Sequence, residues 1–244
     1  MKEHNLTLLS EGQIWGNCNE SQLEVIRKYG IQAAITDLCI LTGSYLCEDN
    51  YNIGKASSLF RRTGWFWTKS DDGDNDVRAV HWSGEKFERY RNERSGVVRP
   101  VLQSSKIFFQ VLPNRTMGYN RIEEVEYGEY PQNAPDFDMQ RRLENEYQRG
   151  MLQRTSRGYT FDKNDDFSRF QPVTYEEYEY NGKRYIRVEA KSSYGNFKLS
   201  NGKEYKNGDY VWVEVSPVKW LIDDRTNTLV SKIGLLAGIK FDNR

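Results

Sequence analysis

Residues 61–102 read RRTGWFWTKSDDGDNDVRAVHWSGEKFERYRNERSGVVRPVL, and this stretch decides the fold that the sequence predicts. The aromatic run over residues 65–67 predicts one strand. The apolar alternation over residues 77–82 predicts a second strand, and residues 97–102 predict a closing strand. An acidic loop separates the first two segments, and a Ser-Gly turn followed by a mixed charged and aromatic segment separates the second from the third.

The composition predicts a soluble, strand-rich protein with a real core. Of the 244 residues, 37% are hydrophobic and 14% are aromatic, and each aromatic side chain can bury a large area. The 35 Lys and Arg residues are balanced by 35 Asp and Glu residues. The overall charge therefore does not indicate a nucleic-acid partner.

Two short packing helices are expected near the N-terminus. Leu23 and Ile26 share one face of a helix within residues 20–30, which ends in glycine. In the segment TDLCILTG, Thr36 is the expected N-cap and Gly43 the expected stop.

The second half predicts a longer helix followed by strands. Residues 136–150 place apolar side chains at every fourth position after an Asp cap, which predicts a helix. An Asn-Gly pair at 181–182 between two alternating runs predicts a tight hairpin. Residues 153–171 are expected to form a polar loop, and strands over 209–215 and 218–224 are expected to join at a Ser-Pro pair.

Turn-forming residues divide the chain. Residues 44–60 show no period and predict a loop, and residues 104–111 predict another strand. The segment LPNRTMGYN that follows is the predicted boundary. The predicted class is α+β, with one unit over residues 1–112 and a second helix-plus-antiparallel-sheet unit over residues 113–244.

The cysteines and the N-terminus indicate the compartment. Cys18, Cys39 and Cys47 are an odd number without CxxC spacing, which favours buried or free thiols over a disulfide framework. No apolar run is long enough for a signal peptide or a membrane span. A cytoplasmic location is expected, or the host cytoplasm if a phage encodes the chain.

Two sets of motifs carry a family resemblance. The segments GWFWTKS, HWSG and GVVRPVL, at residues 64–70, 81–84 and 96–102, resemble the end of a C-type-lectin-like module. This is the version found in formylglycine-generating-enzyme-like proteins and in the variable proteins of diversity-generating retroelements. The nearest resemblance is to a bacterial family of uncharacterised domains, and it implies a C-type-lectin-like fold for the first unit.

The second half resembles the opening of that same domain family. The motifs are YGEYPQ, VSPVKWLIDD and LVSKIGLL, at residues 127–132, 215–224 and 229–236. The halves thus stand in reverse order, so completion of the fold between two copies, as a homodimer, is an alternative to completion within one chain. Formylglycine-generating enzymes use a cysteine pair near the end of the module. No cysteine follows Cys47, so oxidase activity is not carried over.

The acidic loop is the one candidate metal site. Asp72, Asp74 and Asp76 have the spacing that opens an EF-hand, but Val77 and Ser83 stand where Gly and Glu are required. A lectin-style Ca²⁺ site is an alternative to a solvated turn, and no other cofactor is predicted.

No catalytic constellation is recognisable. Neither of the two histidines, His4 and His81, has a local Ser or Cys partner, and His81 is expected to be packed or hydrogen-bonded in a sheet. The chain is therefore predicted not to be an enzyme.

The segment EKFERYRNERSG supplies the candidate binding residues. Tyr and Arg concentrate binding energy at interfaces, and by resemblance this segment and the acidic loop face a ligand. The predicted binding residues are Trp82, Phe87, Arg89, Tyr90, Arg91, Asn92 and Arg94. An ordinary solvated face with Arg–Glu pairs is the alternative.

The functional prediction is a non-enzymatic recognition module that binds a protein through residues 70–76 and 86–96, with a sugar as the second choice of ligand. Two alternatives come from other classes. One is a phage or mobile-element inhibitor of a host defence system, similar to an anti-CRISPR protein. The other is an oxidase of the formylglycine-generating type, which the missing cysteine pair disfavours.

Overall fold

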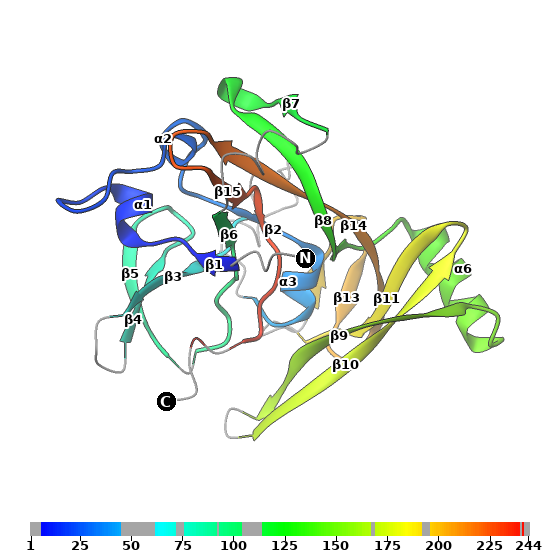
Figure 1. The fold of residues 1–244 in the computed structure, drawn as a ribbon. Helices are drawn as coiled ribbons and strands as arrows, with labels where there is room; N and C mark the ends of the chain where they lie inside the picture. The colour runs from blue at the N-terminus through cyan, green and yellow to red at the C-terminus, as the bar shows by residue number, and fades with distance from the viewer. Residues whose placement is uncertain are drawn as a thin grey trace.

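The computed structural model describes residues 6–44, 62–71, 76–91, 93–103, 114–166, 169–191, 196–239 and 241. Strands predominate over helices in these residues, which confirms the α+β class (Figure 1). The loop predicted over residues 44–60, apart from Ser44, and the strand predicted over residues 104–111 lie outside the described part of the chain.

A nine-stranded sheet forms the centre of the fold. Its main path runs β1-β6-β15-β14-β11-β10-β9, β8 also pairs with β14, and β7 pairs with β8. The strands are β1 (Leu6–Leu8), β6 (Pro100–Gln103), β7 (Thr116–Met117), β8 (Glu123–Asn133), β9 (Gln153–Asp166), β10 (Arg169–Tyr180), β11 (Lys183–Glu189), β14 (Tyr210–Asp223) and β15 (Thr228–Ser231).

This sheet joins the two halves of the chain. β6 lies between β1 and β15, and its Val101 and Leu102 are opposite Val230 and Leu229. The main hydrophobic core likewise contains buried residues of both halves, such as Leu38, Val101, Ile186 and Val213. The boundary predicted at residue 112 lies outside the described residues, and the segments on either side of it share one sheet and one core.

Smaller sheets lie around the large one. β3 (Phe66–Asp71), β4 (Asp76–Val80) and β5 (Lys86–Tyr90) form an antiparallel sheet in the order β3-β4-β5. The other pairs are β2 (Ala34–Ile35) with β16 (Ile233–Gly234), which is parallel, and β12 (Asn196–Lys198) with β13 (Glu204–Lys206). The β3–β4–β5 sheet lies at one end of the molecule, and the long β9–β10 hairpin lies at the other (Figure 1).

The helices begin and end at the residues that their caps require. They are α1 (Glu11–Trp15), α2 (Glu24–Tyr29), α3 (Asp37–Leu41), the 3₁₀ turn η3 (Tyr119–Arg121) and α6 (Phe137–Gln148). The Thr36 hydroxyl accepts from the Cys39 N–H, which confirms that predicted cap. The Asp136 carboxylate accepts from the Met139 N–H, so Asp136 rather than Asp138 caps α6.

α2 is capped from a distance. Its N-cap residue, Leu23, has no side-chain acceptor, and the Asp223 carboxylate at the end of β14 accepts from the Glu24 and Val25 N–H groups at 2.6 and 3.3 Å. Tertiary structure thus supplies a cap that the local sequence lacks.

The Asn-Gly hairpin is confirmed. Asn181 and Gly182 have φ values of 52° and 73° and connect β10 to β11. This left-handed backbone suits Asn and Gly and matches the twist of the two flanking strands.

Two strand predictions were wrong. Residues 153–166 form the strand β9 rather than a polar loop, because pairing with β10 satisfies their backbone even though few of their side chains are apolar. The strands expected over 209–215 and 218–224 form the single strand β14. Pro217 is accommodated at a register shift where Gln132 Nε2 donates to the Ser216 and Pro217 carbonyls at 2.8 and 3.0 Å.

α6 packs on β14 through polar contacts as well as apolar ones. Glu144 accepts two hydrogen bonds from Arg187, both at 2.9 Å, one from Trp212 Nε1 at 3.0 Å and one from Gln148 at 2.8 Å. Burial by itself raises the pKa of Glu144. The hydrogen bonds from Arg187, Gln148 and Trp212 outweigh burial and hold that pKa below its ordinary value.

We expect this network to make stability depend on pH. Because the pKa of Glu144 is lower in the folded state, its stabilising contribution is present above the ordinary Glu pKa and is lost as pH falls through the folded value. Urea unfolding from pH 7 to pH 3 should therefore show a smaller acid-induced loss of unfolding free energy in Glu144→Gln than in the wild type. Glu204→Gln, at an exposed position, is the control and should follow the wild-type curve; parallel curves for wild type and Glu144→Gln would contradict the expectation.

Candidate functional site

Three of the predicted binding residues, Phe87, Arg89 and Tyr90, lie on β5, and we call them the β5 surface. Phe87 and Arg89 point to the face of the strand that packs on Trp65, and Tyr90 points to the opposite face. Phe87 packs edge-on against buried Trp65, with ring centroids 5.5 Å apart. The Arg89 guanidinium lies over both rings, 4.7 Å from the Phe87 centroid and 5.9 Å from that of Trp65. Tyr90 is 66% exposed. An edge strand that carries a stacked arginine and an exposed tyrosine is a suitable contact for a protein.

The strand register brings part of the acidic loop next to this surface. Asp76 lies directly opposite Tyr90, and Val77 lies opposite Arg89. Asp72 and Asp74 lie outside the described residues. Within the described part of the chain, no three His, Cys, Asp or Glu residues are grouped in a way that could hold a metal ion.

The other predicted binding residues are not on the β5 surface. Arg91 and Arg94 are only 7% and 2% exposed, because the C-terminal segment packs on them: the Gly238 N–H donates to the Arg94 carbonyl and the Phe241 N–H to the Arg91 carbonyl. Asn92 lies outside the described residues. Trp82 lies in the β4–β5 turn, about 16 Å from Tyr90 at roughly 3.3 Å per strand residue. Its ring is 3.7 Å from that of His81, and the His81 ring is 5.3 Å from that of Phe87, so Trp82 lies near the Phe87 end of the β5 surface.

His81 lies in the β4–β5 turn rather than in a strand, and it has a local serine partner that the sequence did not lead us to expect. Its Nδ1 lies 2.6 Å from the Ser83 hydroxyl, which donates to the Glu85 carboxylate at 3.1 Å. The carboxylate thus binds the serine rather than the imidazole. In a nucleophilic triad the acid orients the histidine, so this turn lacks that arrangement.

A large groove lies at the Trp82 end of the hairpin, and the sequence analysis did not identify it. Its volume is about 1120 Å³. One wall is the end of α2 with the β4–β5 turn, and the other is formed by β8 and β14. The floor is the β2–β16 pair, to which Thr63 is joined by a β-bridge with Ala34.

The groove is lined by apolar groups and by side chains with compensated charge. Tyr29 and Tyr119 meet edge to face at one end, with centroids 6.4 Å apart. Lys232 lies over the Tyr29 ring and forms an ion pair with Glu124 at 2.7 Å. Lys219 lies 3.8 Å from Glu126.

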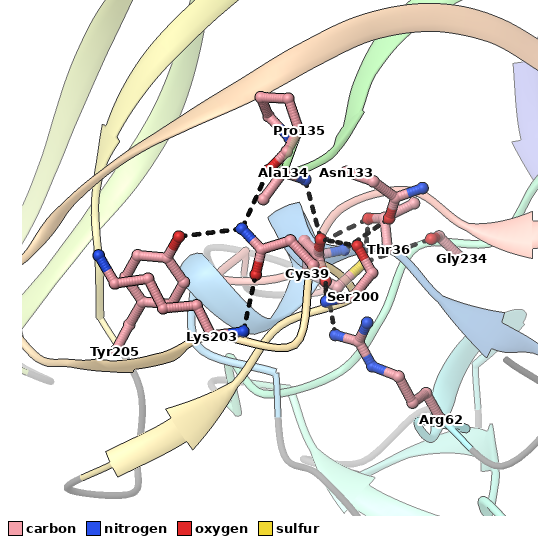
Figure 2. Close-up of polar contacts among 12 residues, drawn as sticks. Thr36, Cys39, Arg62, Asn133, Ala134, Pro135, Ser200, Lys203, Tyr205 and Gly234 are labelled. Carbon is pink, nitrogen blue, oxygen red and sulfur yellow. Dashed lines mark hydrogen bonds and ion pairs between the residues drawn. The ribbon is translucent and has the colours of Figure 1, made fainter. Parts of the chain in front are cut away.

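The buried carboxylate of Asp37 connects the segments that form the floor of the groove through hydrogen bonds and an ion pair. Asp37, at the start of α3, is fully buried and accepts from the Ala134 N–H at 2.8 Å, from the Ser200 N–H at 2.9 Å and from the Ser200 hydroxyl. Arg62, next to Thr63 of the floor, forms an ion pair with it at 2.7 Å. The Asp37 N–H donates to Asn133, which lines the groove. Figure 2 shows how these contacts bring α3, the end of β8 and residue 200 together.

The arginine of the closing GVVRP motif has a structural role. Arg99 is fully buried, stacks on Phe66 at 5.4 Å, and donates to the carbonyls of Ser231 at 3.0 Å and Ile31 at 2.9 Å. Burial lowers its pKa to about 10, so the guanidinium remains charged at neutral pH. Through these two hydrogen bonds Arg99 links Ile31, which lines the groove, to Ser231 of β15 in the large sheet.

The described cysteines are free thiols. Cys18 is exposed and Cys39 is buried behind the groove floor, which agrees with the predicted absence of a disulfide framework among them. Burial raises the pKa of Cys39 to about 12, so it is not a reactive thiolate. Cys47 lies outside the described residues.

Sequence patterns could not reveal the groove, because its lining comes from residues between Tyr29 and Ile233 that no local motif connects. In the described part of the chain, no helix is both long enough and apolar enough to cross a membrane. Comparisons with protein-family models, curated proteins and solved structures gave no match.

Proposed function

We propose that this chain is a non-enzymatic recognition module that binds a protein partner through the β5 surface. The observation that carries the proposal is the stacking of Arg89 over Phe87 and Trp65 on the edge strand β5, whose next residue, Tyr90, is exposed on the other face. Stacking restrains the guanidinium before a partner arrives, so less conformational freedom is lost on binding. The resemblance of residues 64–102 to a C-type-lectin-like unit supports the same function, since such units present ligand-facing residues there.

A protein suits this surface better than the other ligands considered. Arg and Tyr are enriched among the residues that dominate protein–protein binding energy. A carbohydrate ligand and the inhibition of a host defence system stay as alternatives, and no described residue favours either of them over general protein recognition.

The test is capture of a partner from a lysate of the source cell or its host. Arg89→Ala/Tyr90→Ala should lose the partner that the wild type retains, with affinity reduced by at least about 30-fold if either residue is a hot spot. Arg91 is left intact because it is buried and its removal would disturb the fold.

The control is Arg141→Ala/Tyr210→Ala, which removes the same residue types from exposed positions elsewhere. It should retain the partner. Retention of the same partner by folded Arg89→Ala/Tyr90→Ala would show that the β5 surface is not the binding site.

A further inference from the structure

We infer that the groove between α2 and the β8–β14 pair is a second binding site, and that its ligand is an extended polypeptide segment without net charge. The groove adjoins the β4–β5 turn, whereas Tyr90 lies at the far end of β5. The inference therefore goes beyond the β5 surface and does not depend on it.

The size of the groove suits a ligand larger than a typical small molecule. Small-molecule pockets usually enclose about 300–1,000 Å³, and this groove, at about 1120 Å³, lies just above the upper end of that range and has room for several residues of an extended chain. It is built from several separate parts of the chain, so an occupant would contact α2, the β4–β5 turn, β8 and β14 together. The exposed ring of Tyr119, which is 68% exposed at one end, would cover such a segment at low conformational cost.

Charge selects against acidic and nucleic-acid ligands. Each lysine in the lining has a carboxylate partner: Lys232 pairs with Glu124 and Lys219 with Glu126. An anionic ligand would have to compete with both carboxylates, and a cationic one with both lysines. A neutral segment disturbs neither pair.

Apolar side chains of such a segment can pack against apolar residues that line the groove. Ile31, Ile35 and Ile233 line the groove near the floor, and Pro217 lines the opposite wall. Burying an apolar side chain against them gains about 25 cal/mol for each Å² removed from water.

The side-chain amides of Gln132 and Asn133 can form hydrogen bonds with the backbone of such a segment. Gln132 uses its NH₂ group on the Ser216 and Pro217 carbonyls, which fixes the amide orientation and leaves Oε1 as an unburied acceptor. Asn133 uses its oxygen on the Asp37 N–H, which leaves Nδ2 as an unburied donor. An acceptor beside a donor is complementary to the N–H and C=O groups of an extended peptide.

The experiment is selection from a display library of random linear 12-residue peptides on the full chain, followed by fluorescence anisotropy with the enriched peptides. The wild type should enrich peptides with apolar side chains and net charge near zero. Tyr119→Ala and Ser83→Trp, the second of which fills the groove from an exposed turn position, should each weaken binding by at least about tenfold.

Two further variants make the outcome specific. Lys219→Glu replaces the lysine of the Lys219–Glu126 pair by a carboxylate, so that two carboxylates line this part of the groove. Peptides selected on this variant should therefore be rich in Lys and Arg. Arg89→Ala/Tyr90→Ala should bind the original peptides with unchanged affinity, which separates this site from the β5 surface. The inference is overturned if no peptide is enriched, if the enriched peptides are acidic, or if they bind Tyr119→Ala and Ser83→Trp, both still folded, as tightly as the wild type.

Discussion

Replacement of Asp37 by alanine is expected to lower the free energy of unfolding by about 3–5 kcal/mol, the usual cost of removing one partner of a buried ion pair. Asp37 is fully buried, and its removal leaves Arg62 without its carboxylate and the Ala134 and Ser200 N–H groups without their acceptor. Urea unfolding with linear extrapolation measures the change.

A double-mutant cycle separates the ion pair from the hydrogen bonds. Arg62→Met should cost less than Asp37→Ala, because Asp37 would keep its donors from Ala134 and Ser200. The double variant should cost less than the sum of the single variants, since the two side chains interact directly.

The matched control is Asp138→Ala, whose side chain is 70% exposed on α6. Its effect should stay within about 0.5 kcal/mol, as is usual for surface substitutions. A loss below about 1 kcal/mol in Asp37→Ala, or strictly additive effects in the cycle, would show that Asp37 does not organise this region.

Replacement of Gln140 by alanine is expected to cost about 2–4 kcal/mol, because each buried polar group left unpaired costs about 1–3 kcal/mol. Gln140 lies in α6 and acts as the missing strand partner of Trp212. Its Nε2 donates to the Trp212 carbonyl at 2.6 Å, and its Oε1 accepts from the Trp212 N–H at 2.9 Å. The amide thus closes an edge of β14 next to its pairing with β8.

A charge variant at the same position gives an independent readout. A carboxylate at position 140 cannot donate to the Trp212 carbonyl, so Gln140→Glu should be destabilised at neutral pH. Protonation restores the donor, which raises the folded pKa of the new carboxyl. The stability of Gln140→Glu relative to the wild type should therefore be greatest at low pH and fall as pH rises through that pKa.

Arg141→Ala, one residue along α6 and largely exposed, is the control for both variants and should leave stability within about 0.5 kcal/mol. If Gln140→Ala unfolds like Arg141→Ala, water has replaced the amide and the edge of β14 does not depend on it.

Much of the candidate β5 surface was predictable, but its limits were not. The sequence pattern located the strands β3 and β4 and the turn at residues 83–84, but it did not predict that residues 86–90 form the strand β5, whose register places Tyr90 opposite Asp76. The same pattern could not distinguish exposed Arg89 from buried Arg91 and Arg94, because the C-terminal segment that covers those two is more than a hundred residues away in sequence.

The sequence by itself determined the features that depend on neighbouring residues. The caps at Thr36 and Asp136, the Asn181-Gly182 hairpin and the α+β class follow from local hydrogen bonds, backbone conformation and residue spacing. Tertiary structure alone decided that residues 153–166 are a strand, that Asp223 caps α2, and which residues line the groove. Each of these depends on a partner distant in the chain, and a polar or apolar pattern does not specify which distant backbone or side chain will satisfy it.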